Sequence, residues 1–119
     1  SSYNKISMSL QKEDPDITKE KYNRIRTKHP HRLPIVVEAE PPLVLSQTKF
    51  LVPESFSIGQ LLIAIRKRIK EGLHASDALF LLVGGKLFAS LLLVQNVWEE
   101  NNVNGFLIVG VSKENAFGK

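Results

Sequence analysis

The residue types that commonly perform chemistry are sparse in this chain and poorly spaced for catalysis. Cysteine is absent, which excludes thiol catalysis, thiolate metal sites and disulfides. His29 and His31 flank Pro30 without a neighbouring carboxylate, and His74 lies far away in sequence, so no metal site is expected. Gly84-Gly85-Lys86 lacks the spacing of a phosphate-binding loop, and no elbow motif presents a nucleophilic serine. We therefore predict a protein that is not an enzyme and that needs no cofactor or metal.

A glycine near the end of the sequence is the one further pattern with chemical potential. Gly118 follows the aromatic Phe117 and precedes Lys119, after a polar spacer. Because glycine has no side chain, its carbonyl group can enter a narrow active site that excludes a β-carbon. The same pattern is also typical of a frayed chain end with an incidental glycine. The residues alone leave both interpretations open.

The positive charge of the chain is concentrated near its beginning. The formal net charge is +4; the first 33 residues hold eight Lys or Arg against four Asp or Glu, and the remainder holds eight of each sign. Such a basic segment suits an acidic partner, whether nucleic acid, acidic tubulin-like tails or anionic lipid. It equally suits a solvated helix surface that has no partner.

Length and hydropathy set the class of protein. The 119 residues suffice for one domain with its own core, and 43% apolar with 24% charged residues is typical of a folded domain. The longest unbroken apolar run is Ala78–Val83, whereas a membrane-spanning helix needs about 20 residues. No signal-type apolar segment begins the sequence. We expect a soluble, cytoplasmic protein.

The sequence predicts that the chain begins with helical elements. We predict a loose arm over residues 1–6 and a short helix over 7–13. A second helix, capped by Asp16, ends before Pro30 and has an apolar stripe of Ile17, Tyr22 and Ile25.

Strands then alternate with helices. The first two strands cover residues 33–38 and 49–52, and the second is apolar at consecutive positions, so both of its faces need cover. Ser57 and Gln60 form a capping box for a helix that runs to about Lys70, with Gly72 as its C-terminal cap. The remaining prediction comprises strands over 79–83, 86–88 and 106–111, a turn at Gly84-Gly85, and a helix from Ser90 to Trp98.

This order of elements predicts an α+β fold. A mixed sheet of four to five strands around one central helix resembles the β-grasp of ubiquitin, here with two extra N-terminal helices. The corresponding division of the chain is an N-terminal arm and helical extension over residues 1–30, a β-grasp core over 31–112 and a flexible C-terminal tail over 113–119.

Seven segments carry a more specific resemblance, in unbroken order over about residues 10–119. They are Arg32-Leu33-Pro34-Ile35-Val36-Val37-Glu38, Lys49-Phe50-Leu51-Val52-Pro53, Ile58-Gly59-Gln60, Ile65-Arg66-Lys67-Arg68-Ile69, Asp77-Ala78-Leu79-Phe80, Gly105-Phe106-Leu107 and Phe117-Gly118. Together they resemble the autophagy ubiquitin-like modifiers, the family of the GABA-receptor-associated protein and the microtubule-associated protein light chain.

The resemblance implies a function for the tail. Members of this family are cut by a cysteine protease after a glycine, which an E1-like and an E2-like enzyme then join to phosphatidylethanolamine. Here the cut would fall between Gly118 and Lys119, with Phe117 fitted by the processing enzyme and Gly118 conjugated. Two acyl chains give stable anchoring, so the chain would move from the cytoplasm to the autophagosome membrane after lipidation.

The resemblance also implies a groove for receptor and adaptor peptides of the form aromatic–x–x–aliphatic, which add a strand to a sheet edge. Lys49 would bridge the groove mouth and Arg68 would pair with peptide acids. The aromatic pocket would be lined by Ile25, Pro34, Val36, Lys49, Leu51 and Phe106. The aliphatic pocket would be lined by Val37, Phe50, Val52, Pro53, Phe56, Leu61 and Ala64. Each apolar residue among them could instead belong to an ordinary core.

The sequence departs from the family pattern at Lys21, where many members carry an acid, and at Ala64, which is smaller than usual. Both differences would change which peptides bind.

Two other functions stay open. One is a basic adaptor, never conjugated, that binds microtubules or nucleic acid, although nucleic acid is the less favoured partner. The other is the sister modifier joined to a protein lysine, which usually needs no trimming at a residue such as Lys119.

Overall fold

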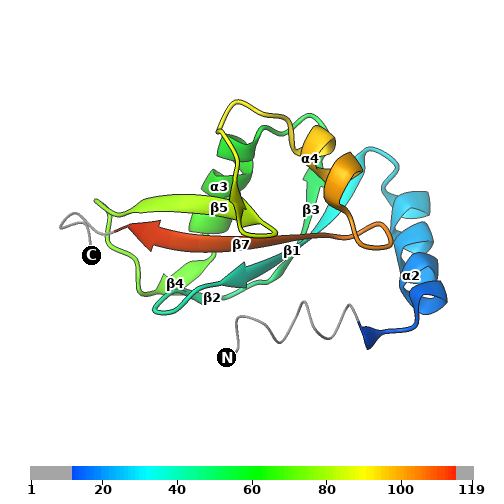
Figure 1. Ribbon diagram of the computed structural model, residues 1–119, viewed down its shortest axis with the longest axis horizontal. Helices are drawn as coiled ribbons and strands as arrows, with labels where there is room; N and C mark the ends of the chain where they lie inside the picture. Colours follow the sequence, from blue (N-terminus) through cyan, green and yellow to red (C-terminus); the bar gives the residue numbers. More distant parts are fainter. Residues whose placement is uncertain (1–11, 115–119) are drawn as a thin grey trace.

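A computed structural model describes residues 12–114 and contains a mixed sheet with helices on both of its faces (Figure 1). The elements, in chain order, are α2 (Pro15–Lys28), β1 (Arg32–Ala39), β2 (Val44–Leu45), β3 (Lys49–Pro53), α3 (Ile58–Arg66), β4 (Ile69–Glu71), β5 (Ala78–Val83), β6 (Lys86–Leu87), α4 (Val94–Asn101) and β7 (Leu107–Glu114). The predicted first helix, over residues 7–13, lies almost entirely outside the described residues.

The main sheet has the strand order β3-β1-β7-β5-β6. β1 runs antiparallel to β3 and parallel to β7, and β5 runs antiparallel to β7. A smaller sheet pairs β2 with β4. The mixed sheet and the helix packed on it confirm the predicted α+β, ubiquitin-like architecture.

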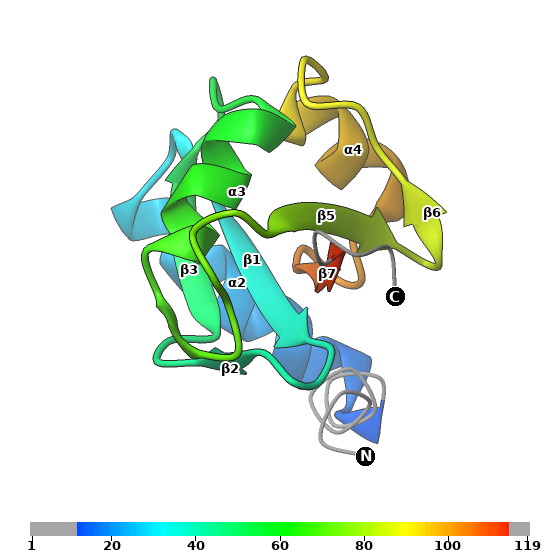
Figure 2. The ribbon, with the colours of Figure 1, turned by 90° about the vertical axis from the view of Figure 1, so that its left-hand side faces the viewer.

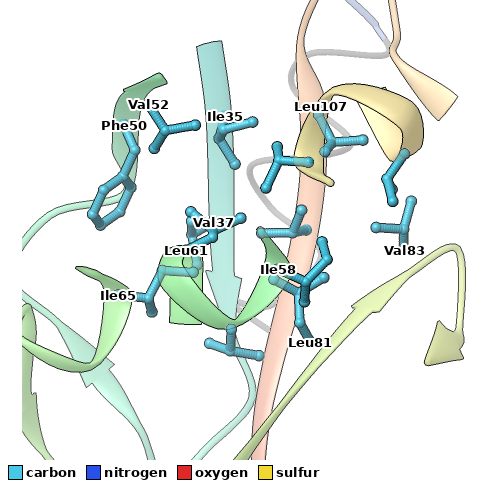
Figure 3. Close-up of a cluster of buried hydrophobic side chains, with 14 of the residues drawn as sticks. Ile35, Val37, Phe50, Val52, Ile58, Leu61, Ile65, Leu81, Val83 and Leu107 are labelled. Atoms are coloured by element: carbon cyan, nitrogen blue, oxygen red, sulfur yellow. The ribbon is translucent and has the colours of Figure 1, made fainter. Parts of the chain in front are cut away.

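The core lies between the main sheet and helices α3 and α4 (Figure 2). Alternate side chains of β1 and β3, including Ile35, Val37 and Phe50, point toward Leu61 and Ile65 of α3 (Figure 3). All six positions from Leu33 to Glu38 are nevertheless buried. β1 is therefore covered on both faces, by α3 on one and by α2 on the other.

Helix α2 begins two residues earlier than predicted. Asp14, not Asp16, is its N-cap: the Asp14 side chain accepts a hydrogen bond from the Asp16 N–H (2.9 Å), and Pro15 occupies the first turn. The end at Lys28, before Pro30, is confirmed. Ile17 was wrongly assigned to the apolar stripe, because it is 48% exposed and the adjacent Thr18 is buried instead.

Helix α3 has the predicted capping box but ends early. The Ser57 hydroxyl accepts from the Gln60 N–H, and the Gln60 side chain accepts from the Ser57 N–H. The helix stops at Arg66 rather than Lys70, because Ile69–Glu71 form β4 and pair with β2. Gly72 therefore follows a strand and caps no helix; a β-carbon there would overlap the Pro42 carbonyl group.

Two further boundaries differ. The last helix starts at Val94, not Ser90, and its N-cap Leu93 offers no side-chain cap. The last strand was predicted to end at Val111, whereas β7 continues through Glu114, because residues 78–82 of β5 pair with residues 110–114. The turn at Gly84-Gly85 is confirmed, with φ of 57° and 80°.

Candidate functional site

Strand β3 forms one edge of the main sheet, and no strand within residues 12–114 pairs with its outer side. The Val37 N–H donates to the Thr48 carbonyl (2.7 Å), so the backbone groups of Thr48 face β1. Because these groups alternate in direction along an antiparallel strand, those of Lys49 and Leu51 face outward. The outer edge of β3 therefore presents backbone groups to which an added strand could bind.

Two side chains of the protein already donate hydrogen bonds to the outward carbonyl groups of Lys49 and Leu51. Gln47 Nε2 donates to the Lys49 carbonyl (2.7 Å), and Arg32 Nη1 donates to the Leu51 carbonyl (3.2 Å). Both donors belong to exposed residues. Side chains that cover an edge in this way guard it against unwanted pairing, and an incoming strand would compete with them for the same oxygen atoms.

A hollow of about 1270 Å³ lies between α2 and β3, beside this edge. Pro34, Val36, Lys49 and Leu51 of its lining alternate with the core residues Ile35 and Phe50, which also border it, so the hollow lies on the sheet face turned away from α3. The structure brings all six residues predicted for the aromatic pocket to its lining: Ile25, Pro34, Val36, Lys49, Leu51 and Phe106.

The rim of this hollow, called the α2 hollow below, carries more cations than anions. Its lining cations are Lys21, Arg24, Lys28 and Lys49, and its lining acids are Glu13 and Glu20. Lys21 Nζ binds Glu13 Oε2 at 2.6 Å. The hydrogen bonds from Lys21 and Thr18 lower the pKa of Glu13, so this pair keeps its opposite charges. Arg24, Lys28 and Lys49 then outnumber the one remaining lining acid, Glu20, so the rim attracts anionic groups.

Helix α2 is held over the hollow by aromatic packing that the sequence analysis did not foresee. The Tyr22 ring stacks on Trp98 (5.9 Å between centroids) and meets Phe106 edge-on (6.4 Å). The Arg26 guanidinium lies 5.8 Å from both the Tyr22 and the Trp98 ring centroids. Trp98 Nε1 donates to the Gly105 carbonyl (2.8 Å). These contacts fix the wall of the hollow that Phe106 contributes.

A second hollow, of about 510 Å³, lies on the α3 side of β3. Four predicted groove residues line it, and four further lining residues were missed. The predicted ones are Phe50, Phe56, Ala64 and Arg68; the missed ones are Gln47, Gln60, Ile63 and Lys67. Ile63 could have been found, because it is apolar yet lies off the buried stripe of α3, and it is 59% exposed.

The other residues predicted for the aliphatic pocket do not line this α3 hollow. Val37, Val52 and Leu61 lie in the core at 0%, 3% and 0% exposure, and Pro53 is half-buried at the end of β3. Val37, Val52 and Leu61 therefore have almost no surface of their own to offer a ligand. A direct peptide contact for these four residues stays a prediction.

The two hollows lie on opposite faces of β3, and this arrangement defines what could bind. Phe50 points toward α3, whereas Lys49 and Leu51 point toward α2. In an extended peptide, residues three apart also point to opposite faces. A strand added at the outer edge could therefore place two side chains of aromatic–x–x–aliphatic spacing into the two hollows.

The remaining candidates form no site within the described part of the chain. Residues 12–114 contain no group of three His, Asp or Glu side chains able to hold a metal, and no helix long and apolar enough to cross a membrane. Phe117, Gly118 and Lys119 lie outside the described residues, so their roles stay predictions.

The strand order, the helix packed on the sheet and the preceding α2 define the class: this is a ubiquitin-like protein. Residues 17–118 match the family model for the autophagy protein Atg8, ubiquitin like. The chain therefore belongs to the Atg8 family, and as a member it is an autophagy ubiquitin-like modifier rather than an enzyme.

Relatives and solved structures agree with this assignment. The chain is 40% identical to autophagy-related protein 8e of Arabidopsis thaliana, across 92% of this chain and 93% of the relative. It is 38% identical to autophagy-related protein 8 of Mycosarcoma maydis, across 81% and 83%. The crystal structure of ATG8 from Trypanosoma brucei matches with a TM-score of 0.78 and 28% identity, across 91% and 95% of the two chains.

Proposed function

We propose that this chain is conjugated to phosphatidylethanolamine through Gly118 and recruits receptors to autophagosomal membranes through the edge of β3. The observation that carries the proposal is the pair of hollows on opposite faces of one sheet edge. Membership of the Atg8 family supports the conjugation step.

The docking step uses backbone and side-chain recognition together. The partner is an extended receptor or adaptor peptide that adds a strand along Lys49–Pro53. Its aromatic side chain enters the α2 hollow and its aliphatic side chain enters the α3 hollow. Lys49 closes the mouth of the first, and Arg68, with Lys67 beside it, attracts acids near the peptide.

The conjugation step uses the tail. A cysteine protease hydrolyses the peptide bond between Gly118 and Lys119 and leaves a free Gly118 carboxylate, with Phe117 seated in the protease. A carboxylate does not condense with an amine unaided, so an E1-like enzyme activates it and an E2-like enzyme transfers it to the lipid amine. The two acyl chains then hold the protein on the membrane.

Mass spectrometry of the intact protein tests this proposal. The chain is incubated with the processing protease and the conjugation enzymes of its own organism, and with vesicles that contain phosphatidylethanolamine. We expect loss of everything after Gly118, followed by addition of one lipid. The Gly118→Ala variant should keep its fold and gain no lipid. Lipidation of that variant, or none of the wild type, would contradict the proposal, and an adduct on a protein lysine would favour the sister modifier.

A second candidate function rests on the exposed cations of α2, which include Lys19, Arg24 and Lys28. They suit acidic tubulin tails on microtubules. Binding to tubulin should weaken steeply with salt and should be lost when these three residues become glutamate. If those variants bind tubulin as the wild type does, this adaptor function is wrong.

A further inference from the structure

The α3 hollow is larger than a single aliphatic side chain requires. Its volume is about 510 Å³, which lies within the range of about 300–1,000 Å³ typical of pockets that hold whole small molecules. Ala64 contributes to this size, because its side chain is only one methyl group at a lining position of α3. A valine or leucine side chain of a docked peptide would therefore occupy only part of the hollow.

Two aromatic side chains line the hollow, and both are anchored in the core. Phe50 of β3 is 8% exposed and points toward α3 (Figure 3). Phe56, which lies between β3 and α3, is partly buried and packs against the same core. Ring pairs in offset or edge-on contact are more favourable than their buried area alone predicts. An aromatic side chain in the hollow can therefore make ring contacts that an aliphatic side chain cannot make.

The polar part of the lining disfavours large basic side chains. It consists of two amides and two cations, with no Asp or Glu among the lining residues: Gln47, Gln60, Lys67 and Arg68. Among residues 12–114, neither Lys67 nor Arg68 forms an ion pair that would cancel its charge. A lysine or arginine that entered the hollow would be repelled by these like charges and would find no acid in the lining to bind. The large side chains that remain are the apolar and aromatic ones.

We propose that the α3 hollow prefers an aromatic side chain to an aliphatic one, and that Ala64 is the residue that sets this preference. The receptor peptides that bind this chain best then have the spacing aromatic–x–x–aromatic, in place of the aromatic–x–x–aliphatic spacing that the family resemblance implies. Residues three apart still point to opposite faces, because only the size of the second side chain changes. This inference rests on the proposed docking along β3 and names the class of peptide that docks there.

Calorimetry with the full chain and three synthetic peptides tests the preference. The peptides are identical except at the second anchor position, which is phenylalanine, leucine or alanine. We expect the phenylalanine peptide to bind about tenfold more tightly than the leucine peptide, because even one extra methylene group in an apolar pocket changes discrimination by about tenfold or more. The alanine peptide should bind least tightly. If the leucine peptide binds as tightly as the phenylalanine peptide, or more tightly, the proposed preference is overturned.

The Ala64→Leu variant tests which residue sets the preference. Its larger side chain takes up the space that an aromatic ring would fill. We expect the phenylalanine peptide to lose a factor of about 100 in affinity and the leucine peptide a factor of about ten, so that the preference disappears. Affinity for the alanine peptide should stay unchanged, which would show that the variant is folded and that its α2 hollow is intact.

Ala75→Leu is the matched control for this substitution. Ala75 is exposed and lines neither hollow, so all three affinities should equal those of the wild type. If Ala64→Leu keeps the wild-type preference, Ala64 does not set it and the proposal is wrong. If none of the three peptides binds the wild-type chain, the docking step of the proposed function fails instead.

Discussion

The ring of Tyr22 lies directly against the backbone of Gly105. A β-carbon placed on Gly105 would overlap the Tyr22 ring, and Gly105 has a φ of 98°, which L side chains rarely adopt. The Gly105 carbonyl also accepts the Trp98 indole N–H (2.8 Å), and its N–H donates to Asn102 Oδ1 (2.9 Å). The absence of a side chain at one residue thus lets α2 pack on the ubiquitin-like body.

The Gly105→Ala substitution should therefore destabilise the protein and displace α2. We expect a loss of about 2–4 kcal/mol in the free energy of unfolding, from backbone strain together with overlap in a packed contact. Denaturant titration measures the loss. Movement of Tyr22 away from Trp98 should appear as a change in indole fluorescence under native conditions.

Gly84→Ala is the matched control for this substitution. Gly84 also has a positive φ, 57°, but a β-carbon there would meet nothing within 4 Å. It should cost about 1–2 kcal/mol, the left-handed backbone penalty alone. Equal losses in the two variants would show that the Tyr22 contact contributes nothing.

The elements whose signals are local were predictable from the sequence. The capping box of Ser57 and Gln60, the break before Pro30 and the glycine turn all depend on neighbouring residues, and all are confirmed. The end of α3 was not predictable. The helical pattern continues to Ile69, but the Arg68 carbonyl accepts from the Ser46 N–H (2.7 Å) and Oγ (3.0 Å). This pairing with a segment far away in the sequence ends the helix.

Some residues of the candidate site were likewise predictable from the sequence, and others were not. The six residues that the resemblance assigned to one pocket all line the α2 hollow, and their contact with a peptide stays a prediction. The packing of Tyr22 on Trp98 joins elements 76 residues apart, and no local signal marks it. Apolar type alone could not separate Phe56, which lines the α3 hollow, from Leu61, which lies in the core.

Substitutions in the two hollows should weaken peptide binding independently of each other. Phe106→Ala removes an aromatic wall of the α2 hollow, and Ala64→Leu fills the α3 hollow. We expect each to lower affinity for an aromatic–x–x–aliphatic peptide about tenfold, or about 1.4 kcal/mol, by calorimetry.

Truncated peptides show which hollow each substitution affects. Ala64→Leu should make little further difference to a peptide whose aliphatic residue is already alanine, since that peptide leaves the α3 hollow empty. Phe106→Ala should still weaken that peptide. If both variants weaken this truncated peptide equally, the assignment of one side chain to each hollow is wrong.

The pair of Asp77 and Lys113 should make stability depend on pH in acid. The hydrogen bonds from the His74 N–H and from Lys113 lower the pKa of Asp77 below its ordinary value of 3.8. The folded state therefore binds this proton less readily than the unfolded state does. The stabilisation is complete above about pH 4 and is lost as the pH falls through the folded-state pKa.

Denaturant titrations of wild type and Asp77→Asn from pH 7 to pH 2 check this dependence. The wild type should be the more stable protein at pH 7, and the two unfolding free energies should converge as the pH falls below 4. A difference that stays constant over the whole range would mean that the charge of Asp77 does not stabilise the fold.

The Gln47 side chain should restrain docking at the edge of β3. Its Nε2 donates to the outward Lys49 carbonyl, and an added strand must displace this bond to use the same oxygen. A hydrogen bond at an exposed site contributes about 0.5–1 kcal/mol net, so Gln47→Ala should tighten peptide binding about two- to fivefold. Gln95→Ala on α4, away from the edge, is the control and should leave affinity unchanged. If Gln47→Ala weakens binding instead, Gln47 contacts the peptide directly, and the wild-type bond to Lys49 is not a competitor.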